Sequence, residues 1–201
     1  MASEALPEMT PPALFSVAER RQLLALARRS VEEAVLHGRL PPVNEGEMPA
    51  RLCEPRACFV TLKKAGRLRG CIGQLKADAP LYRAVMFNAR SAALYDSRFP
   101  PVARGELPAL GCEVSVLTEP QPLPFAHPRE LLEKLRPGVD GVVLQARGRS
   151  ATFLPQVWEQ LPEPVEFLSR LALKAGLEAD DWRLPGTAVM TYQVEAFSDA
   201  A

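Results

Sequence analysis

Five consecutive residues, Arg69-Gly70-Cys71-Ile72-Gly73, hold the side chains of this chain that are best suited to chemistry. In an extended strand, side chains two residues apart share a face, so Arg69 and Cys71 are predicted to lie side by side. A guanidinium beside a thiol favours the thiolate, the form of cysteine that attacks electrophiles. The flanking glycines indicate a bulge, or a position where a ligand or another backbone comes close. The alternative is a small buried cysteine at a tight packing point.

A later segment, 111–118, alternates apolar and polar residues as a strand does, and it places Glu113 and Ser115 on one face. If this strand joins the same sheet, Thr61 and Ser115 share a polar surface with Arg69 and Cys71. Glu113 is then the natural ion-pair partner of Arg69. The alternative is the solvated face of an antiparallel sheet.

Asp96 and Arg98 follow the predicted end of a helix. Asp96 either binds a ligand or caps the turn and pairs with Arg98, and the second role is favoured for an acid in a turn. Cysteine catalysis usually needs a base nearby, and the chain has two histidines, His37 and His127. His127 is the better candidate, but a structural or surface role fits each histidine better.

The sequence shows no motif for a metal or a cofactor, and we expect neither. The four cysteines, at 53, 58, 71 and 112, match no zinc or disulfide framework, so reduced thiols are expected. The chain contains no glycine-rich phosphate loop, Walker lysine, GxSxG elbow or dinucleotide-binding fingerprint.

Length and charge narrow the class of protein further. The chain has 201 residues, 47% of them hydrophobic, and a formal net charge of zero. Neutral charge disfavours nucleic-acid binding. The sequence contains no run of about 18 apolar residues, so no membrane-spanning helix is predicted. The N-terminal residues lack the pattern of a signal peptide, so a cytoplasmic location is expected. We expect residues 1–15 to form a flexible tail and 16–201 a single domain.

Hydrophobic periodicity predicts the elements that must position these residues. Ser16 and Glu19 fit a capping box for a helix over 17–37. Asp78 is the expected cap of a helix over 80–95. Further helices are predicted at 128–134 and 164–176, and the proline-rich segment 39–56 is predicted as a loop.

Hairpins connect the predicted strands. The first joins 57–64 to 67–73 through a three-residue loop, 64–66, which places Leu62 opposite Leu68 and Thr61 opposite Arg69. Further strands are expected at 111–118, 141–146, 150–154 and 187–195. Hairpins interrupted by helices indicate the α+β class, with a largely antiparallel sheet flanked by helices.

The ordered series of segments resembles the AMMECR-type domain family, the A component of the AmmeMemoRadiSam system. The residues that carry the resemblance are FVTLKK at 59–64, LRGCIG at 68–73, Ala92 and Ala93 followed by Asp96, Arg98 and Phe99, EVSVL at 113–117, PG at 137–138 with DG at 140–141, FLPQV at 153–157 and KAGL at 174–177. The resemblance implies a larger sheet-and-helix part, a smaller lobe, and a cleft between them that holds the cysteine motif. It also implies two partners, a Memo-like protein and a radical S-adenosylmethionine enzyme, but no reaction.

Two hypotheses follow for function. In the first, the protein is a cysteine-dependent enzyme or enzyme component that acts on a small substrate in a cleft around Cys71, with Arg69 activating the thiol and Glu113 orienting Arg69 or moving a proton. In the second, it is a non-catalytic adaptor whose Cys71 face binds a protein partner or a modified peptide. A concave, exposed Cys71 favours the first hypothesis and a buried Cys71 the second.

Overall fold

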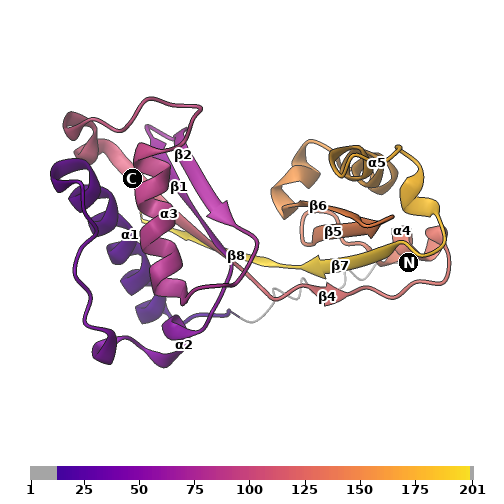
Figure 1. Ribbon diagram of the computed structural model, residues 1–201, viewed down its shortest axis with the longest axis horizontal. Coiled ribbons are helices and arrows are strands. Elements are labelled where there is room, and N and C mark those ends of the chain that lie inside the picture. The colour runs from indigo at the N-terminus through magenta and orange to yellow at the C-terminus, as the bar shows by residue number, and fades with distance from the viewer. Residues whose placement is uncertain (1–12, 200–201) are drawn as a thin grey trace, which may run out of the picture.

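A computed structural model describes residues 13–199, which form two lobes, each built on its own antiparallel sheet (Figure 1). The expected α+β class is confirmed, with two sheets in place of one. The larger lobe contains a four-stranded sheet in the order β2-β1-β3-β8. Its strands are β1 (Cys58–Lys64), β2 (Arg67–Gln74), β3 (Leu110–Leu117) and β8 (Val194–Ser198).

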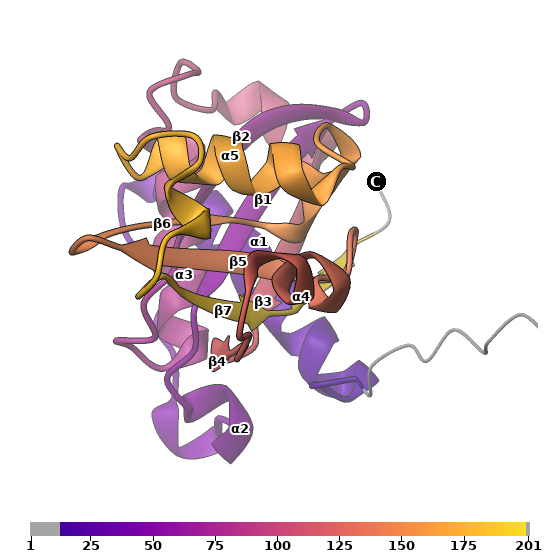
Figure 2. The ribbon, with the colours of Figure 1, turned by 90° about the vertical axis from the view of Figure 1, so that its right-hand side faces the viewer.

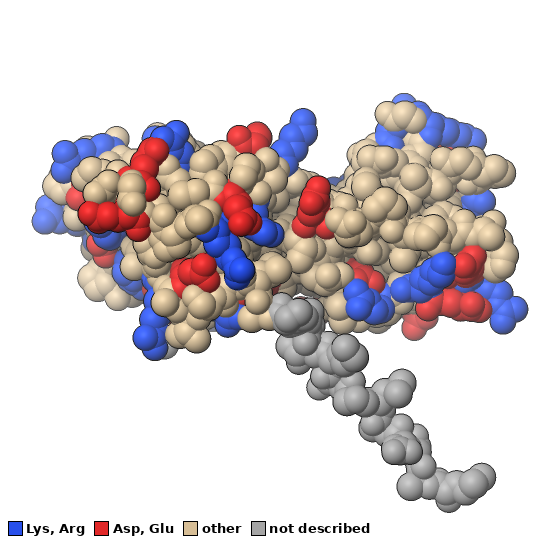
Figure 3. Space-filling view, turned by 90° about the horizontal axis from the view of Figure 1, so that it is seen from below, with Lys and Arg blue, Asp and Glu red and all other residues tan. Residues whose placement is uncertain are grey.

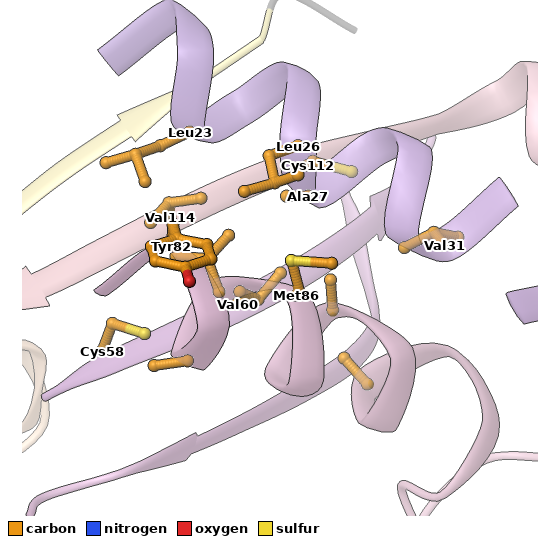
Figure 4. Close-up of a cluster of buried hydrophobic side chains, with 14 of the residues drawn as sticks. Leu23, Leu26, Ala27, Val31, Cys58, Val60, Tyr82, Met86, Cys112 and Val114 are labelled. Carbon is orange, nitrogen blue, oxygen red and sulfur yellow. The ribbon is translucent and has the colours of Figure 1, made fainter. Parts of the chain in front are cut away.

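Two long helices, α1 (Val17–His37) and α3 (Leu81–Leu94), cover one face of this sheet. Figure 4 shows Leu23 and Leu26 of α1 pointing towards Val114 of β3, with Tyr82 of α3 beside them. The opposite face of the sheet is turned towards the second lobe (Figure 1). Side chains on that opposite face are therefore free to form a site between the lobes.

The sequence signals for the two helices had different outcomes. For α1 the capping box is present, because Ser16 Oγ accepts from the Glu19 backbone, and Gly38 ends the helix in the left-handed conformation. For α3 the predicted cap is wrong. Its first turn follows Pro80, while Asp78 accepts a hydrogen bond from Gln74. The predicted loop 39–56 also contains a short helix, α2 (Ala50–Cys53).

The smaller lobe has a sheet in the order β4-β7-β5-β6, with α5 (Pro164–Lys174) packed over it (Figure 2). Its strands are β4 (Gln121–Pro122), β5 (Gly141–Ala146), β6 (Arg149–Phe153) and β7 (Ala188–Tyr192). The short helix α4 (Pro128–Lys134) begins at His127, whose Nδ1 accepts from the Glu130 backbone. His127 is therefore a helix cap.

The chain crosses between the lobes twice, once after β3 and once between β7 and β8 (Figure 1). The two crossings are tied together. The Thr118 N–H donates to the Gln193 carbonyl at 2.9 Å, and the Gln193 N–H donates to Thr118 Oγ1 at 2.8 Å. The segment 187–195 was predicted as one strand, but Gln193 separates β7 from β8, which belong to different sheets.

The predicted tail boundary at residue 15 is also corrected. Residues 1–12 lie outside the described part of the chain. Phe15, however, is only 2% exposed and belongs to the core of the larger lobe, where its ring lies edge-on to that of Phe197. The packed core therefore begins before the predicted start at residue 16.

The register of the first hairpin differs from the predicted one. Ala65 and Gly66 form a two-residue turn, both with positive φ, in place of the three-residue loop. The pairing then shifts by one residue: Lys63 faces Leu68, but the next residue towards the start of β1, Leu62, faces Gly70. Arg69 is the extra residue of a β-bulge. The bulge allows a two-residue turn to coexist with one apolar face, which a regular hairpin could not do.

Two surface properties complete the description. No helix among the described residues is long and apolar enough to cross a membrane. On the face seen in Figure 3, cationic and anionic side chains are interspersed over both lobes.

Candidate functional site

A cavity of about 300 Å³ lies between the two lobes, on the face of the larger sheet that the helices leave uncovered. The sheet supplies most of its wall and the 3-10 helix Pro155–Glu159 with its flanks supplies the rest. The lining residues are Phe59, Thr61, Leu68, Cys71, Arg98, Glu113, Ser115, Leu154, Gln156, Val157, Gln160 and Val194. We call this cavity the interlobe cleft. Five of the residues expected at the site, Thr61, Cys71, Arg98, Glu113 and Ser115, line it.

Cys71, Thr61 and Glu113 form one row across three strands. Thr61 on β1 faces Cys71 on β2, and on its other side it faces Glu113 on β3. Directly opposed side chains on neighbouring strands lie within reach of one another. The Thr61 hydroxyl donates to Cys71 Sγ at 3.2 Å. The half-buried thiol therefore has a polar neighbour inside the cleft.

The expected ion pair between Arg69 and Glu113 is wrong. Glu113 Oε2 accepts from Lys63 Nζ at 2.8 Å. Arg69 donates through Nε and Nη2 to the two carboxylate oxygens of Glu106, at 3.1 and 2.9 Å. The Arg69 guanidinium holds the pKa of the Glu106 carboxyl well below its usual range.

The same bulge overturns the prediction that Arg69 and Cys71 share a face. An extra residue at position 69 breaks the alternation of side chains, so Leu68 lines the cleft together with Cys71. Arg69 packs away from the cleft, with its guanidinium 6.0 Å from the centre of the Phe99 ring. Arg69 therefore does not contact the thiol.

Asp96 and Arg98 hold the backbone of Cys71 at the free edge of the sheet. Asp96 Oδ2 accepts from the Cys71 N–H at 2.8 Å, and Arg98 Nη2 donates to the Cys71 carbonyl at 3.2 Å. The two side chains also bond each other, at 2.9 and 2.7 Å. Hydrogen bonds from Arg98 hold the pKa of the Asp96 carboxyl well below its usual range and outweigh the opposing effect of burial. Of the two roles considered, Asp96 has the structural one, while Arg98 also reaches the cleft.

Both glycines of the motif serve close packing. A Cβ on Gly70 would lie 2.2 Å from the Ala92 carbonyl oxygen of α3, and a Cβ on Gly73 would lie 2.3 Å from the Phe59 ring. Gly70 therefore allows β2 to approach the helix. Gly73 makes room for an aromatic ring that lines the cleft. Neither glycine lines the cleft itself; of the alternatives that the sequence offered, Gly70 fits the close approach of another backbone.

The remaining cysteines differ from Cys71 in their surroundings. Burial raises the pKa of the Cys58 thiol to about 12 and that of the Cys112 thiol to about 11. Cys53 is half-buried on α2. Among residues 13–199 no group of three histidine, cysteine or acidic side chains is arranged to hold a metal.

Sequence reasoning missed the second wall of the cleft. Leu154, Gln156, Val157 and Gln160 come from the smaller lobe, and Val194 begins β8. A 3-10 helix lacks the periodicity that marks longer elements, so these residues carried no pattern of their own. The signal that could have pointed to them is the block 153–157, which is part of the family resemblance.

The cleft thus combines a thiol, a hydroxyl donor and a carboxylate on one wall with two carboxamides on the other. Apolar contact surface comes from Phe59, Leu154 and Val194, which pack in one cluster between the lobes. This arrangement suits a small molecule with one polar end.

Known proteins match almost the whole chain. A protein of Thermofilum pendens is 38% identical over 196 residues, covering 91% of each chain. Protein MJ0810 of Methanocaldococcus jannaschii is 37% identical and covers 85% of this chain and 86% of its own. The crystal structure titled "Uncharacterized Protein PH0010", from Pyrococcus horikoshii, superposes with a TM-score of 0.80 at 34% identity, covering 93% of this chain and 94% of that one.

The family model named AMMECR1 matches residues 24–197, a span that includes both lobes and every residue that lines the cleft. The chain therefore belongs to the AMMECR1 family.

Proposed function

We propose that the interlobe cleft binds a small molecule and that Cys71 is the group that reacts with it. The protein would then act as a cysteine-dependent enzyme, or as the substrate-holding component of one. The observation that carries this proposal is the position of the Cys71 sulfur, which lines a cavity shared by both lobes and accepts a hydrogen bond from Thr61 at 3.2 Å.

Each neighbouring group has a role in this proposal. Cys71 is the nucleophile, and the Thr61 hydroxyl stabilises negative charge that collects on the sulfur, because a donor bonded to a charged atom favours the charged form. Glu113 lies in the same row on the far side of Thr61 and pairs with Lys63, so it contributes a polar wall to the cleft while the thiol proton passes to the solvent. Arg98 and Asp96 fix the Cys71 backbone and so the direction of the thiol.

Alkylation by iodoacetamide, followed by peptide mass spectrometry, tests the proposal. Cys53 is the internal reference, because it is also half-buried but lies on α2. We expect Cys71 to react about tenfold faster than Cys53. Thr61→Val removes the hydroxyl and should lower the Cys71 rate about fivefold, the equivalent of one hydrogen bond of about 1 kcal/mol. Thr61→Ser retains the hydroxyl and should restore the rate. Equal rates at the two cysteines would contradict the proposal.

We further propose that the protein acts beside a Memo-like protein and a radical S-adenosylmethionine enzyme, as the AmmeMemoRadiSam grouping implies. Membership of the family supports this assignment. A pull-down with the full chain as bait, read by mass spectrometry, should recover both proteins. Their absence, with other proteins recovered, would count against it.

An alternative function, an adaptor without turnover, is favoured by one surface feature. On α3 and just beyond it, Phe87 is 47% exposed and Tyr95 is 65% exposed. The guanidinium of Arg90 lies 5.4 and 5.9 Å from the centres of these two rings. Aromatic and arginine side chains are enriched among residues that dominate binding energy at protein interfaces.

The adaptor function has a separate test with the Memo-like protein. Phe87→Ser with Tyr95→Ser should abolish its binding if the α3 surface is the interface, while Cys71→Ser should leave binding unchanged. If Cys71→Ser abolishes binding and the Phe87, Tyr95 double variant keeps it, the partner binds at the cleft and the α3 surface is rejected as the interface.

A further inference from the structure

We infer that the interlobe cleft selects an uncharged ligand that carries a carbonyl or amide group, held by Gln156 and Gln160 on the wall opposite Cys71. This inference rests on the proposed function and adds the chemical class of the substrate to it. It also assigns ligand-binding roles to two residues of the smaller lobe.

The first step is the charge inside the cleft. Two charged side chains line it, Arg98 and Glu113. Each is already paired: Arg98 with Asp96 at 2.7 Å, and Glu113 with Lys63 at 2.8 Å. A charged ligand would have to displace one of these partners or bring an unpaired charge into a partly desolvated space. Both carry a free-energy cost that a neutral ligand avoids.

The second step is the wall supplied by the smaller lobe, which is uncharged. Its lining residues are Leu154, Gln156, Val157 and Gln160. Both glutamines are exposed residues of this wall, and within residues 13–199 no hydrogen bond joins the side-chain amide of either one to another protein group. Each carboxamide offers one acceptor oxygen and two N–H donors. Such a pair suits the oxygen and N–H groups of another amide, or a carbonyl.

The third step is size and shape. A cavity of about 300 Å³ lies at the lower end of the range for ligand pockets. Apolar surface between the polar walls comes from Phe59, Leu154 and Val194. The ligand that fits is therefore a small neutral molecule with a short hydrocarbon part and one carbonyl or carboxamide group.

Two alkylating reagents of nearly equal size separate charge from reactivity. Iodoacetamide is a neutral carboxamide, and iodoacetate is an anion. With either reagent the cysteine sulfur forms a bond to the methylene carbon as the carbon–iodine bond breaks. Iodide leaves with the electron pair, and the thiol proton passes to the buffer. Glutathione, alkylated under the same conditions, gives the intrinsic ratio of the two rates.

For each cysteine, the rate with iodoacetamide is divided by the rate with iodoacetate, and the result is divided by the same ratio for glutathione. We expect this normalised ratio to be about fivefold higher at Cys71 than at Cys53, the equivalent of one neutral hydrogen bond. In the Gln156→Leu, Gln160→Leu double variant the Cys71 ratio should fall to that of Cys53. Gln145→Leu is the matched control, because Gln145 on β5 is exposed like Gln156 and Gln160 but does not line the cleft. It should leave the ratio unchanged.

Three outcomes overturn the inference. If the ratios at Cys71 and Cys53 are equal, or if the double variant keeps the wild-type ratio, the cleft does not select neutral amides although Cys71 remains a reactive residue. If neither reagent alkylates Cys71 in the folded protein, the proposed function fails and the inference fails with it. Unchanged thermal unfolding and an unchanged Cys53 rate show that the variants are folded.

Discussion

The backbone N–H of Cys71 donates a hydrogen bond to Oδ2 of Asp96 at 2.8 Å, on the side of β2 that has no neighbouring strand. Together with Arg98, which binds the Cys71 carbonyl, this carboxylate occupies the position that another strand would take. Exposed strand edges tend to pair with other chains. Asp96 and Arg98 therefore protect the edge and fix the thiol at the same time.

Replacing Asp96 should destabilise the protein. Asp96→Ala leaves the Cys71 N–H and the Arg98 guanidinium without their carboxylate partner, whose side chain is 4% exposed. We expect a loss of about 2 kcal/mol in the free energy of unfolding. This corresponds to a melting temperature lower by roughly 4–8 °C in a chain of this size. Calorimetry measures it, and a change within error would show that the edge needs no cap.

The same carboxylate predicts a pH dependence. Hydrogen bonds from Arg98 lower the pKa of Asp96 in the folded state, so the unfolded state binds protons more readily. The stabilisation is complete above the unfolded value of about 3.9 and is lost as pH falls through the folded value. Chemical unfolding between about pH 5 and pH 2 should therefore show a shallower loss of stability for Asp96→Asn than for the wild type. Parallel curves would contradict the prediction.

Arg69 should contribute to stability and not to the reactivity of Cys71. Its side chain is 12% exposed, and its guanidinium pairs with Glu106. Arg69→Ala should lower the free energy of unfolding by about 2 kcal/mol and change the Cys71 alkylation rate less than about twofold, since no contact with the thiol is lost. Arg67→Ala, at an exposed position on the same strand, is the control. A large drop in the Cys71 alkylation rate of the folded Arg69 variant would contradict this expectation and support the side-by-side arrangement of Arg69 and Cys71 that the sequence predicts.

Gly70 should tolerate no larger residue. An added methyl group would meet the Ala92 carbonyl oxygen at 2.2 Å, and this backbone atom cannot move without shifting α3. Gly70→Ala should cost about 3 kcal/mol and lower the melting temperature by roughly 6–12 °C. Gly105→Ala, where the added carbon meets nothing within 4 Å, should leave it nearly unchanged. Equal melting temperatures for the two variants would refute the close approach of β2 and α3.

Cys58 and Cys112 should resist alkylation until the protein unfolds. Both side chains are buried, and burial raises their pKa values to about 12 and about 11. At about pH 8 both therefore remain protonated. Mass spectrometry of the folded protein should find label at Cys53 and Cys71 but not at these two, and label at all four after denaturation. Labelling of Cys58 in the folded state would indicate that β1 opens.

The elements that sequence predicted well carry local signals. Ser16 and Glu19 mark the start of α1, Gly38 its end, and alternation marks β3. The polar row was predicted in part, since Thr61, Cys71, Glu113 and Ser115 do share the cleft. These features depend on residues close together in the chain, or on the two-residue repeat of a strand.

The wrong predictions concern the register of the first hairpin and the division into two sheets, which depend on contacts between distant parts of the chain. The bulge at Arg69 accompanies the contact between Gly70 and Ala92, which belongs to a helix 22 positions later in the sequence. The break at Gln193 depends on its hydrogen bonds with Thr118. Neither partner can be identified from the local pattern, so the register and the division into two sheets required the structure.

The strand order of the larger sheet also constrains how the protein can fold during synthesis. β8 pairs with β3 over the residues from Glu113 to Leu117, and beyond it Asp199 binds Arg28 of α1. The ribosome makes the whole smaller lobe between these two strands. The β3 edge of the larger sheet therefore stays unpaired until β8 has been synthesised. The smaller lobe is contiguous from β4 to β7 and can fold before that point. The part of the protein that is translated first is thus the part that finishes folding last.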